Sequence, residues 1–363
     1  MRVVIAGGGT GGHLYPGIAV ARELLAREKD AQISFAGTER GIESRVVPRE
    51  GFELDVIRSG GLKGKSIADR ARGAVLVPLS VVDAWRVVTR RRPALVIGVG
   101  GYSSGPVVLV AALRGVPTML LEQNAVPGLT NRLLAPFVRA AAVTFESTKT
   151  FFGAKAFVSG NPVRPEFLAT AGSSSESGVD EHASIIRVLV FGGSQGAHAI
   201  NVAMVEAAAE LAAGRPGVHL THQTGERDVE MVRDAYRQAG IQAIVEPFLY
   251  DMGSRLGQAD LIVARAGATT IAEITAAGKP AILVPLPTAT DDHQRRNAEA
   301  LAAKGAAELM PQGEMNGHRL AGRILALAGD PAARARMAGA ARAFARPDAA
   351  RVIVDRAVAL ARR

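Results

Sequence analysis

Short apolar segments of strand length alternate with longer amphipathic segments along most of the chain. Residues 1–7 are apolar, and in the segment after them Ile18, Val20, Ala21, Leu24 and Leu25 fall on one face of a helix. This alternation predicts repeated β-α-β units and a mainly parallel sheet. The further strand candidates are residues 31–37, 53–58, 93–99, 116–122, 140–145 and 154–160.

The pattern is interrupted once and then restarts. Residues 170–184 are rich in serine, glycine and acidic residues without periodicity, and we expect a flexible insertion there. Strand candidates resume at 187–193, 219–225, 243–248, 259–265 and 280–286, and the chain after residue 331 is helical and basic. We predict two Rossmann-like, doubly wound α/β domains. They cover residues 1–163 and 164–340, and a C-terminal helix at 341–363 packs back on the first domain.

Composition narrows the class of protein. The 363 residues exceed what one ordinary core needs, and 48% hydrophobic with 21% charged residues is typical of a globular chain. The absence of cysteine excludes a disulfide scaffold, a thiol nucleophile and a cysteine-ligated zinc site. No apolar run is long enough to span a bilayer, and the N-terminus does not read as a signal peptide. We therefore expect a cytosolic protein.

The net charge of +9 is unevenly distributed. Residues 58–92 hold nine Lys or Arg against Asp69 and Asp83, and residues 334–363 hold eight Arg against Asp348 and Asp355. Two local basic faces indicate that an anionic surface is met at particular places. No nucleic-acid-binding motif accompanies these arginines, so we do not expect a nucleic-acid partner.

A glycine-rich turn follows the first strand candidate. Gly7, Gly9 and Gly12 satisfy the pattern G-x-G-x-x-G, and such a turn lets backbone N–H groups approach a phosphate at the positive end of a helix. A dinucleotide site would also need an acid after the second strand, where Glu39 is available. A tight turn without a ligand is the alternative.

A second glycine-rich turn, residues 192–197, opens the second half of the chain. A dehydrogenase needs one such turn for its cofactor, whereas nucleotide-sugar glycosyltransferases and sugar-nucleotide epimerases are built from two such domains with the nucleotide between them. The duplication therefore favours a transferase, by analogy of fold.

A third candidate is the turn and helix start at residues 264–273. Thr270 and Glu273 have the spacing of a helix capping box, which is the structural alternative. A carboxylate in this first turn can also accept ribose hydroxyls. The histidines His198, His219 and His222 have no recognisable ligand spacing, so we assign no metal site, and we interpret His222 as structural.

Seven motifs together resemble one family. The order and spacing of these motifs are similar to those of the undecaprenyl-diphospho-muramoylpentapeptide β-N-acetylglucosaminyltransferases of peptidoglycan synthesis, in glycosyltransferase family 28. The motifs are GGGTGGH (7–13), GGYSSGP (100–106), EQNAVPGLTNR (122–132), GNPVR (160–164), GGSQGA (192–197), HQTGE (222–226) and ARAGATTIAEI (264–274).

The resemblance implies a GT-B fold and a function. Such an enzyme moves GlcNAc from UDP-GlcNAc to the C4 hydroxyl of a polyprenyl-diphosphate-linked muramoyl-pentapeptide, with inversion at the anomeric carbon and with neither a cofactor nor a nucleotide-bound metal. It acts as a peripheral protein at the cytoplasmic face of the cell membrane. A UDP-GlcNAc 2-epimerase of the same fold and a dinucleotide-binding oxidoreductase remain the alternatives.

The resemblance also implies which residues bind the donor. Asn124 would hydrogen-bond the GlcNAc or its phosphate, Leu249 would offer its backbone to uracil, and Gln294 would bind the donor sugar. His293 precedes Gln294 where the family often has a second glutamine. The remaining positions that match are Thr10, Gly11 and Gly12 at the donor-sugar and acceptor-diphosphate end, Arg164 and Ser194 as diphosphate and uridine contacts from the second domain, and the nucleotide loop Ala268, Thr269, Thr270, Ile271, Ala272 and Glu273, with Glu273 on the ribose.

His13 is the candidate catalytic base. Attack by a sugar hydroxyl needs a group that takes its proton, and His13 directly follows the first glycine turn. The positive end of a helix disfavours an imidazolium, so the ring should be neutral and able to accept a proton. The alternative is that His13 caps the helix or donates to the acceptor diphosphate.

The basic segment before residue 92 is the candidate membrane patch. Apolar residues at helical spacing, with one tryptophan and clustered arginines, suit an interfacial helix on anionic lipid. A core-facing stripe is the alternative. The patch comprises Val75, Leu79, Val82, Trp85, Arg86, Arg90, Arg91 and Arg92.

Overall fold

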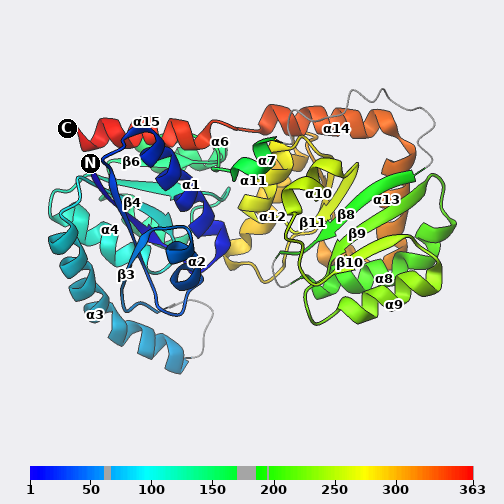
Figure 1. Ribbon diagram of the computed structural model, residues 1–363, viewed down its shortest axis with the longest axis horizontal. Helices are drawn as coiled ribbons and strands as arrows, with labels where there is room; N and C mark the ends of the chain where they lie inside the picture. The colour runs from blue at the N-terminus through cyan, green and yellow to red at the C-terminus, as the bar shows by residue number, and fades with distance from the viewer. Residues whose placement is uncertain (61–66, 170–184, 194–195, 363) are drawn as a thin grey trace. The chain divides into compact units, whose positions relative to one another are not determined.

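The computed structural model describes residues 1–60, 67–169, 185–193 and 196–362 (Figure 1). The expected insertion at 170–184 and the candidate Ser194 lie outside these residues. Contacts divide the chain into two compact units. Unit 1 comprises Met1–Arg164 and Arg346–Arg363, and unit 2 comprises Pro165–Ala345. Unit 2 is therefore an insertion in the chain of unit 1.

Unit 1 is a parallel sheet of seven strands in the order β3-β2-β1-β4-β5-β6-β7. The strands are β1 (Arg2–Gly7), β2 (Gln32–Gly37), β3 (Glu53–Val56), β4 (Leu95–Gly100), β5 (Thr118–Glu122), β6 (Ala140–Val143) and β7 (Ala156–Val158). The helices are α1 (Gly11–Arg27), α2 (Glu43–Arg49), α3 (Ile67–Arg91), α4 (Ser104–Leu113), α5 (Leu129–Leu134), α6 (Glu146–Phe152), the 3₁₀ turn η1 (Gly153–Lys155) and α15 (Ala349–Ala361).

Alternate side chains of β1 point into two different cores, because successive residues of a strand point to opposite faces of the sheet. Val3 and Ile5 pack with α1 and α15. Val4 and Ala6 pack with α3 and α4 on the other face. Both faces of the sheet are thus covered by helices, which explains the continuous apolar runs of the strand candidates.

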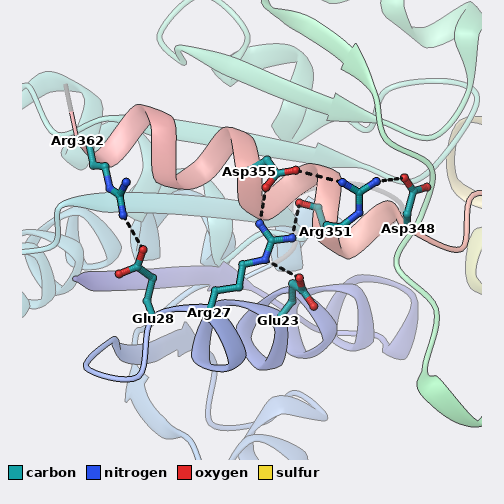
Figure 2. A network of polar contacts seen from close by, with 7 residues as sticks. All are labelled: Glu23, Arg27, Glu28, Asp348, Arg351, Asp355 and Arg362. Carbon is teal, nitrogen blue, oxygen red and sulfur yellow. Dashed lines mark hydrogen bonds and ion pairs between the residues drawn. The ribbon is translucent and has the colours of Figure 1, made fainter.

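Helix α15 at the end of the chain lies against α1 near its start (Figures 1 and 2). Ile353, Val354 and Ala357 are buried in the same core as Leu14 and Ile18. Polar contacts surround this core in Figure 2, including Arg27 with Glu23 (2.7 Å) and with Asp355, Arg351 with Asp348 (2.7 Å), and Arg362 with Glu28 (2.8 Å). These pairs are partly exposed and contribute little, so the apolar face holds the helix in place.

Unit 2 is a parallel sheet of six strands in the order β10-β9-β8-β11-β12-β13. The strands are β8 (Ile185–Phe191), β9 (Gly217–Gln223), β10 (Ala243–Glu246), β11 (Leu261–Ala264), β12 (Ala281–Leu283) and β13 (Glu308–Leu309). The helices are α7 (Pro165–Ala169), α8 (His198–Ala213), α9 (Val229–Ala239), α10 (Met252–Gln258), α11 (Ala268–Ala276), α12 (His293–Ala302), α13 (Gly317–Gly329) and α14 (Pro331–Phe344), with 3₁₀ turns η3 (Thr290–Asp292) and η4 (Gln312–Glu314).

The predicted fold class is confirmed: both units are doubly wound and parallel. Each strand candidate overlaps a strand. The sequence analysis missed β13, whose two residues are too short to give an apolar pattern. The segment 341–363 is not one helix, because α14 ends at Phe344 and α15 begins at Ala349. Within the described part of the chain, no helix has the length and apolar content needed to cross a membrane.

Candidate functional site

Each sheet reverses its strand order at one place, and the candidate loops lie there. In unit 1 the reversal falls between β1 and β4, which end at Gly7 and Gly100. In unit 2 it falls between β8 and β11, which end at Phe191 and Ala264. Open parallel sheets bind their ligands at the carboxyl ends of the strands flanking such a reversal. The topology therefore gives each unit one ligand-binding edge.

The first glycine turn rests on a buried carboxylate. Glu43, fully buried at the start of α2, accepts the N–H of Gly9 (2.8 Å) and both the N–H and the hydroxyl of Thr38 (2.8 Å each). A Cβ atom added at any of three glycines would come within 2.5 Å of this side chain, which explains their requirement: Gly8, Gly37 and Gly41. The Glu43 side chain therefore helps to fix the conformation of the first glycine turn.

His13 lies between the turn after β1 and the turn after β4. Its Nδ1 is 3.3 Å from the hydroxyl of Thr10, the N-cap of α1. Its ring packs so closely on Gly100 (φ +98°) that a Cβ there would lie 2.8 Å from the ring Cδ2. The Thr10 side chain and the Gly100 backbone thus flank the ring.

The EQN motif is organised by Glu122 at the end of β5. Its buried carboxylate accepts the N–H and side-chain amide of Asn124 (3.1 and 3.4 Å), the N–H of Gly128 (3.0 Å) and the amide of Asn131 (2.8 Å). Burial raises the pKa of Glu122, and these donors oppose the shift. Asn124 is therefore held in place by its own loop.

Arg164, expected to contact the ligand from the second domain, belongs to unit 1. Its guanidinium stacks on the ring of Tyr15, 5.2 Å from the ring centroid. Tyr15 follows His13 by two residues on α1, and a Cβ at Gly11 would approach its ring to 3.0 Å. Arg164 therefore contacts α1 within unit 1.

Gln223 joins two of the candidate sites in unit 2. Its side-chain amide donates to the carbonyl of Gly193 in the second glycine turn (2.8 Å), and its oxygen accepts the N–H of Leu249 (3.0 Å). Gly196 approaches the Thr224 carbonyl so closely that a Cβ would lie 1.8 Å from it. Ser194 itself is outside the described residues.

A buried polar chain supports the helix after this turn. His222, fully buried on β9, contacts the hydroxyl of Tyr236 (2.8 Å) and the amide oxygen of Asn201 (3.0 Å). Asn201 donates to Asp228 (2.8 Å), which also contacts His198 at the first residue of α8 (2.9 Å). Burial lowers the pKa of His222 to about 3, so the ring is neutral and structural.

The nucleotide loop begins α11. The helix starts at Ala268 with Gly267 as its N-cap and with no side-chain cap, so the capping-box alternative for Thr270 and Glu273 is wrong. Thr270 already lies inside the first helical turn. Glu273 is 6% exposed and lies about one helical turn along α11 from the carboxyl ends of β8 and β11, where the strand order reverses.

Gln294 lies in the first turn of α12, after two residues in an unusual conformation. Asp291 and Asp292 both have left-handed backbones (φ 56° and 54°), which non-glycine residues rarely adopt and which cluster at functional sites. The side-chain oxygen of Gln294 accepts the N–H of Leu286 (3.0 Å). His293 contacts the carbonyl of Thr290 (2.5 Å).

The predicted membrane patch is only partly available for lipid. Leu79, Val82 and Trp85 are exposed on α3, and the side chain of Val75 is not described. Arg114 stacks over Trp85 at 4.5 Å.

The arginines of the patch differ in their partners. Arg90 and Arg91 both pair with Asp55, which is 2% exposed, and Arg91 also pairs with Glu53. Arg86 is 73% exposed and lies 3.8 Å from Asp83. A buried carboxylate thus pairs with two of these arginines, although the side chain of Arg90 is still 66% exposed.

Models of two family domains match the chain. The glycosyltransferase family 28 N-terminal domain matches residues 3–143, and the glycosyltransferase family 28 C-terminal domain matches residues 187–353. The chain belongs to glycosyltransferase family 28. Family 28 relatives named UDP-N-acetylglucosamine--N-acetylmuramyl-(pentapeptide) pyrophosphoryl-undecaprenol N-acetylglucosamine transferase include one from Pelobacter propionicus, 48% identical over 98% of each chain. Another, from Myxococcus xanthus, is 45% identical over 98% of this chain and 92% of its own.

Solved structures agree with family 28 membership. MurG from Acinetobacter baumannii is 30% identical over 99% of each chain, with a TM-score of 0.81. UDP-GlcNAc 2-epimerase from Neisseria meningitidis, bound to UDP-GlcNAc, has a TM-score of 0.68 at 14% identity, over 98% of this chain and 99% of its own. The second likeness shows the shared fold alone.

Sequence reasoning missed the buried residues that hold the loops: Glu43, Glu122 and Gln223. Each lies in or near a segment that gave a signal, since Gly37 and Gly41 precede Glu43 and the motifs EQN and HQTGE contain the other two. Only the fold shows which backbone group each side chain meets. In the part of the chain that the structure describes, no three His, Asp or Glu side chains are grouped to hold a metal ion.

Proposed function

We propose that this family 28 glycosyltransferase moves GlcNAc from UDP-GlcNAc to the C4 hydroxyl of a polyprenyl-diphosphate-linked muramoyl-pentapeptide. The observation that carries the proposal is the similarity over the full chain to relatives named for that transfer, at 45–48% identity. The epimerase shares the fold at 14% identity, which carries no argument for its activity here.

Unit 2 would bind the donor nucleotide. The N–H of Leu249 is already engaged by Gln223, so its carbonyl is the backbone group that uracil would meet. Glu273 at the buried edge of α11 would accept the ribose hydroxyls, and charge-assisted acceptance of this kind is strong. Gln294, whose oxygen is used by Leu286, would present its amide hydrogens to the sugar. Ala268–Ala272 would let backbone groups approach the nucleotide closely.

Unit 1 would bind the acceptor and supply the base. Thr10, Gly11 and Gly12 open α1, whose N-terminal N–H groups suit a diphosphate. His13 would take the proton of the attacking hydroxyl, while Asn124 and Arg164 would meet the donor's GlcNAc and diphosphate. UDP is a good leaving group that needs charge stabilisation more than protonation.

Association with an anionic membrane surface is part of the proposal. Leu79, Val82 and Trp85 supply exposed apolar area, and Arg86 and Arg92 are exposed cations beside them. Such a helix lies in the interfacial plane of a bilayer, with its cations attracted by anionic headgroups. A lipid-linked acceptor would be met at that surface.

One assay separates the possible activities. UDP release is measured from UDP-GlcNAc with and without the muramoyl-pentapeptide acceptor, and the product is analysed by mass spectrometry. The transferase releases UDP only when acceptor is present and adds one GlcNAc to it. Formation of UDP-ManNAc without acceptor would instead identify an epimerase, and thermal stabilisation by NAD(H) rather than UDP would identify a dinucleotide enzyme.

A further inference from the structure

An apolar groove crosses unit 1 between α3, α4 and α5. Its volume is about 420 Å³. The α5 side is unusually exposed for apolar side chains, since Leu133 is 65% and Phe137 is 48% exposed. Apolar lining comes from Val77, Val81, Leu109, Leu129, Leu133 and Phe137. Exposed apolar surface of this kind marks a binding site more often than chance.

The groove begins at the two loops that form the unit 1 site. The loop after β4 supplies Tyr102 and Gly105 to its wall, and the loop organised by Glu122 leads into Leu129 and Thr130. The first turns of α4 and α5 are in contact there, since a Cβ at Gly105 would lie 3.5 Å from the methyl group of Thr130.

The same loop touches the first glycine turn. A Cβ at Gly101 would lie 2.5 Å from the carbonyl oxygen of Gly8, and the N–H of Gly8 donates to Gly100 (3.3 Å). The loop after β4 therefore connects the glycine turn, where a diphosphate would lie, to the wall of the groove at Tyr102.

We infer that this groove binds the first isoprene units of the acceptor's polyprenyl chain. The inference rests on the proposed function, because the chain is attached to the diphosphate that the glycine turn would hold. An engineered cavity of about 150 Å³ holds benzene, which has six carbons, so the groove has room for about three five-carbon units. The rest of the chain stays in the bilayer.

The groove and the membrane patch use different faces of α3. Val77 and Val81 line the groove, whereas Val82, Trp85 and Arg86 lie outside it. Residues four apart share a helix face, and Val77 and Val81 have that spacing. The groove is thus a pocket for one chain, distinct from the surface that would lie on lipid.

The test compares two acceptors that share the muramoyl-pentapeptide diphosphate and differ only in their tails. One carries a single isoprene unit and the other carries three, both below their micelle concentrations and without vesicles. The wild-type protein should show an acceptor KM about tenfold lower or better for the longer tail, since the two additional isoprene units would be buried in the groove instead of exposed to water. Equal KM values would overturn the inference, as would discrimination that appears only when vesicles are added.

Variants then locate the discrimination. Leu133→Gln and Phe137→Gln, both at exposed positions, should bring the ratio of the two KM values toward one. Phe151→Gln is the matched control, because Phe151 is also 48% exposed but lies on α6 outside the groove. A ratio that survives in both groove variants would overturn the inference. A chain that transfers GlcNAc to neither acceptor would instead contradict the proposed function.

Discussion

The two units hold their glycine turns with different side chains. Each has a glycine turn at its switch point followed by a histidine at the start of a helix, His13 on α1 and His198 on α8. In unit 1 a carboxylate, Glu43, holds the turn, and the histidine packs on the neighbouring backbone at Gly100. In unit 2 a neutral amide, Gln223, holds the turn, and the histidine is tied to Asp228.

The two histidines have different surroundings. His13 contacts the hydroxyl of Thr10 and packs on the backbone of Gly100, so its ring lies against the first glycine turn. His198 is half exposed and belongs to a chain of buried polar groups that ends at His222. Similar sequence signals therefore give a histidine packed on a glycine turn in one unit and a histidine joined to a buried polar chain in the other.

The largest expected difference between the units comes from replacing each of these two histidines by alanine. His13→Ala should lower kcat by about 10²–10⁴-fold, because a positioned base contributes that much. UDP-GlcNAc affinity, measured by calorimetry, should hardly change. His198→Ala should cost about 1 kcal/mol of stability or less, since its ion pair is half exposed. If only the acceptor KM rises in His13→Ala, His13 positions the diphosphate and the base lies elsewhere.

The free energy of unfolding of the two units should change with pH in opposite directions. The folded state keeps His222 neutral down to pH about 3, whereas an unfolded histidine binds a proton near pH 6.5. The free energy of unfolding of unit 2 should therefore fall as the pH drops below 6.5, by about 1.4 kcal/mol per pH unit. His222→Gln should flatten this dependence.

Unit 1 should respond in the opposite sense. Burial raises the pKa of Glu122 above its ordinary 4.5, so its ionisation costs more in the folded state, and the free energy of unfolding falls as the pH rises through that interval. Hydrogen exchange on β5 and β9, corrected for intrinsic rates, reads the two units separately. Parallel pH profiles would mean that neither buried group governs acid stability.

The donor prediction concerns unit 2. Glu273→Gln keeps the side-chain shape but loses charge-assisted acceptance, worth about 1.5–3 kcal/mol, so UDP-GlcNAc affinity should fall at least tenfold. The melting temperature should change little, because Glu273 does not cap α11. Early melting with unchanged affinity for the donor would assign Glu273 a purely structural role.

Exchanging carboxylate and amide at the two residues that hold the glycine turns tests the comparison further. Glu43→Gln should raise the acceptor KM and Gln223→Glu the donor KM, each by about tenfold, since each loses one hydrogen bond to a loop. Steady-state kinetics with each substrate varied in turn checks this. A rise in the same KM for both variants would show that the two turns serve one ligand.

The last prediction concerns the membrane. Arg86→Gln with Arg92→Gln should weaken binding to phosphatidylglycerol vesicles by about 1 kcal/mol per charge, measured by flotation. Arg90 and Arg91 are left intact because Asp55 needs them. Arg237→Gln in unit 2, at a residue 71% exposed, is the matched control. Equal weakening by the control would assign vesicle binding to net charge alone.

The sequence predicted what depends on local pattern. Periodicity located the strands, and the glycines at 7–12 and 192–197 marked both switch points. It failed where the partner is distant in the chain. Nothing near Glu43 indicates that it accepts Gly9, thirty-four residues away, and nothing near Arg90 indicates the buried Asp55. The capping box failed for another reason: Gly267 offered an earlier helix start than Thr270.

The position of α15 has a consequence for the order in which the chain can fold during synthesis. Ile353, Val354 and Leu360 complete the core that begins with Val3 and Ile5. The ribosome releases these residues only after the whole of unit 2 has emerged. Domains usually fold as they emerge, N-terminal first, but here part of one face of the N-terminal sheet, the part that α15 covers, stays exposed while unit 2 folds. A nascent chain stalled before residue 349 would therefore expose that face to chaperones.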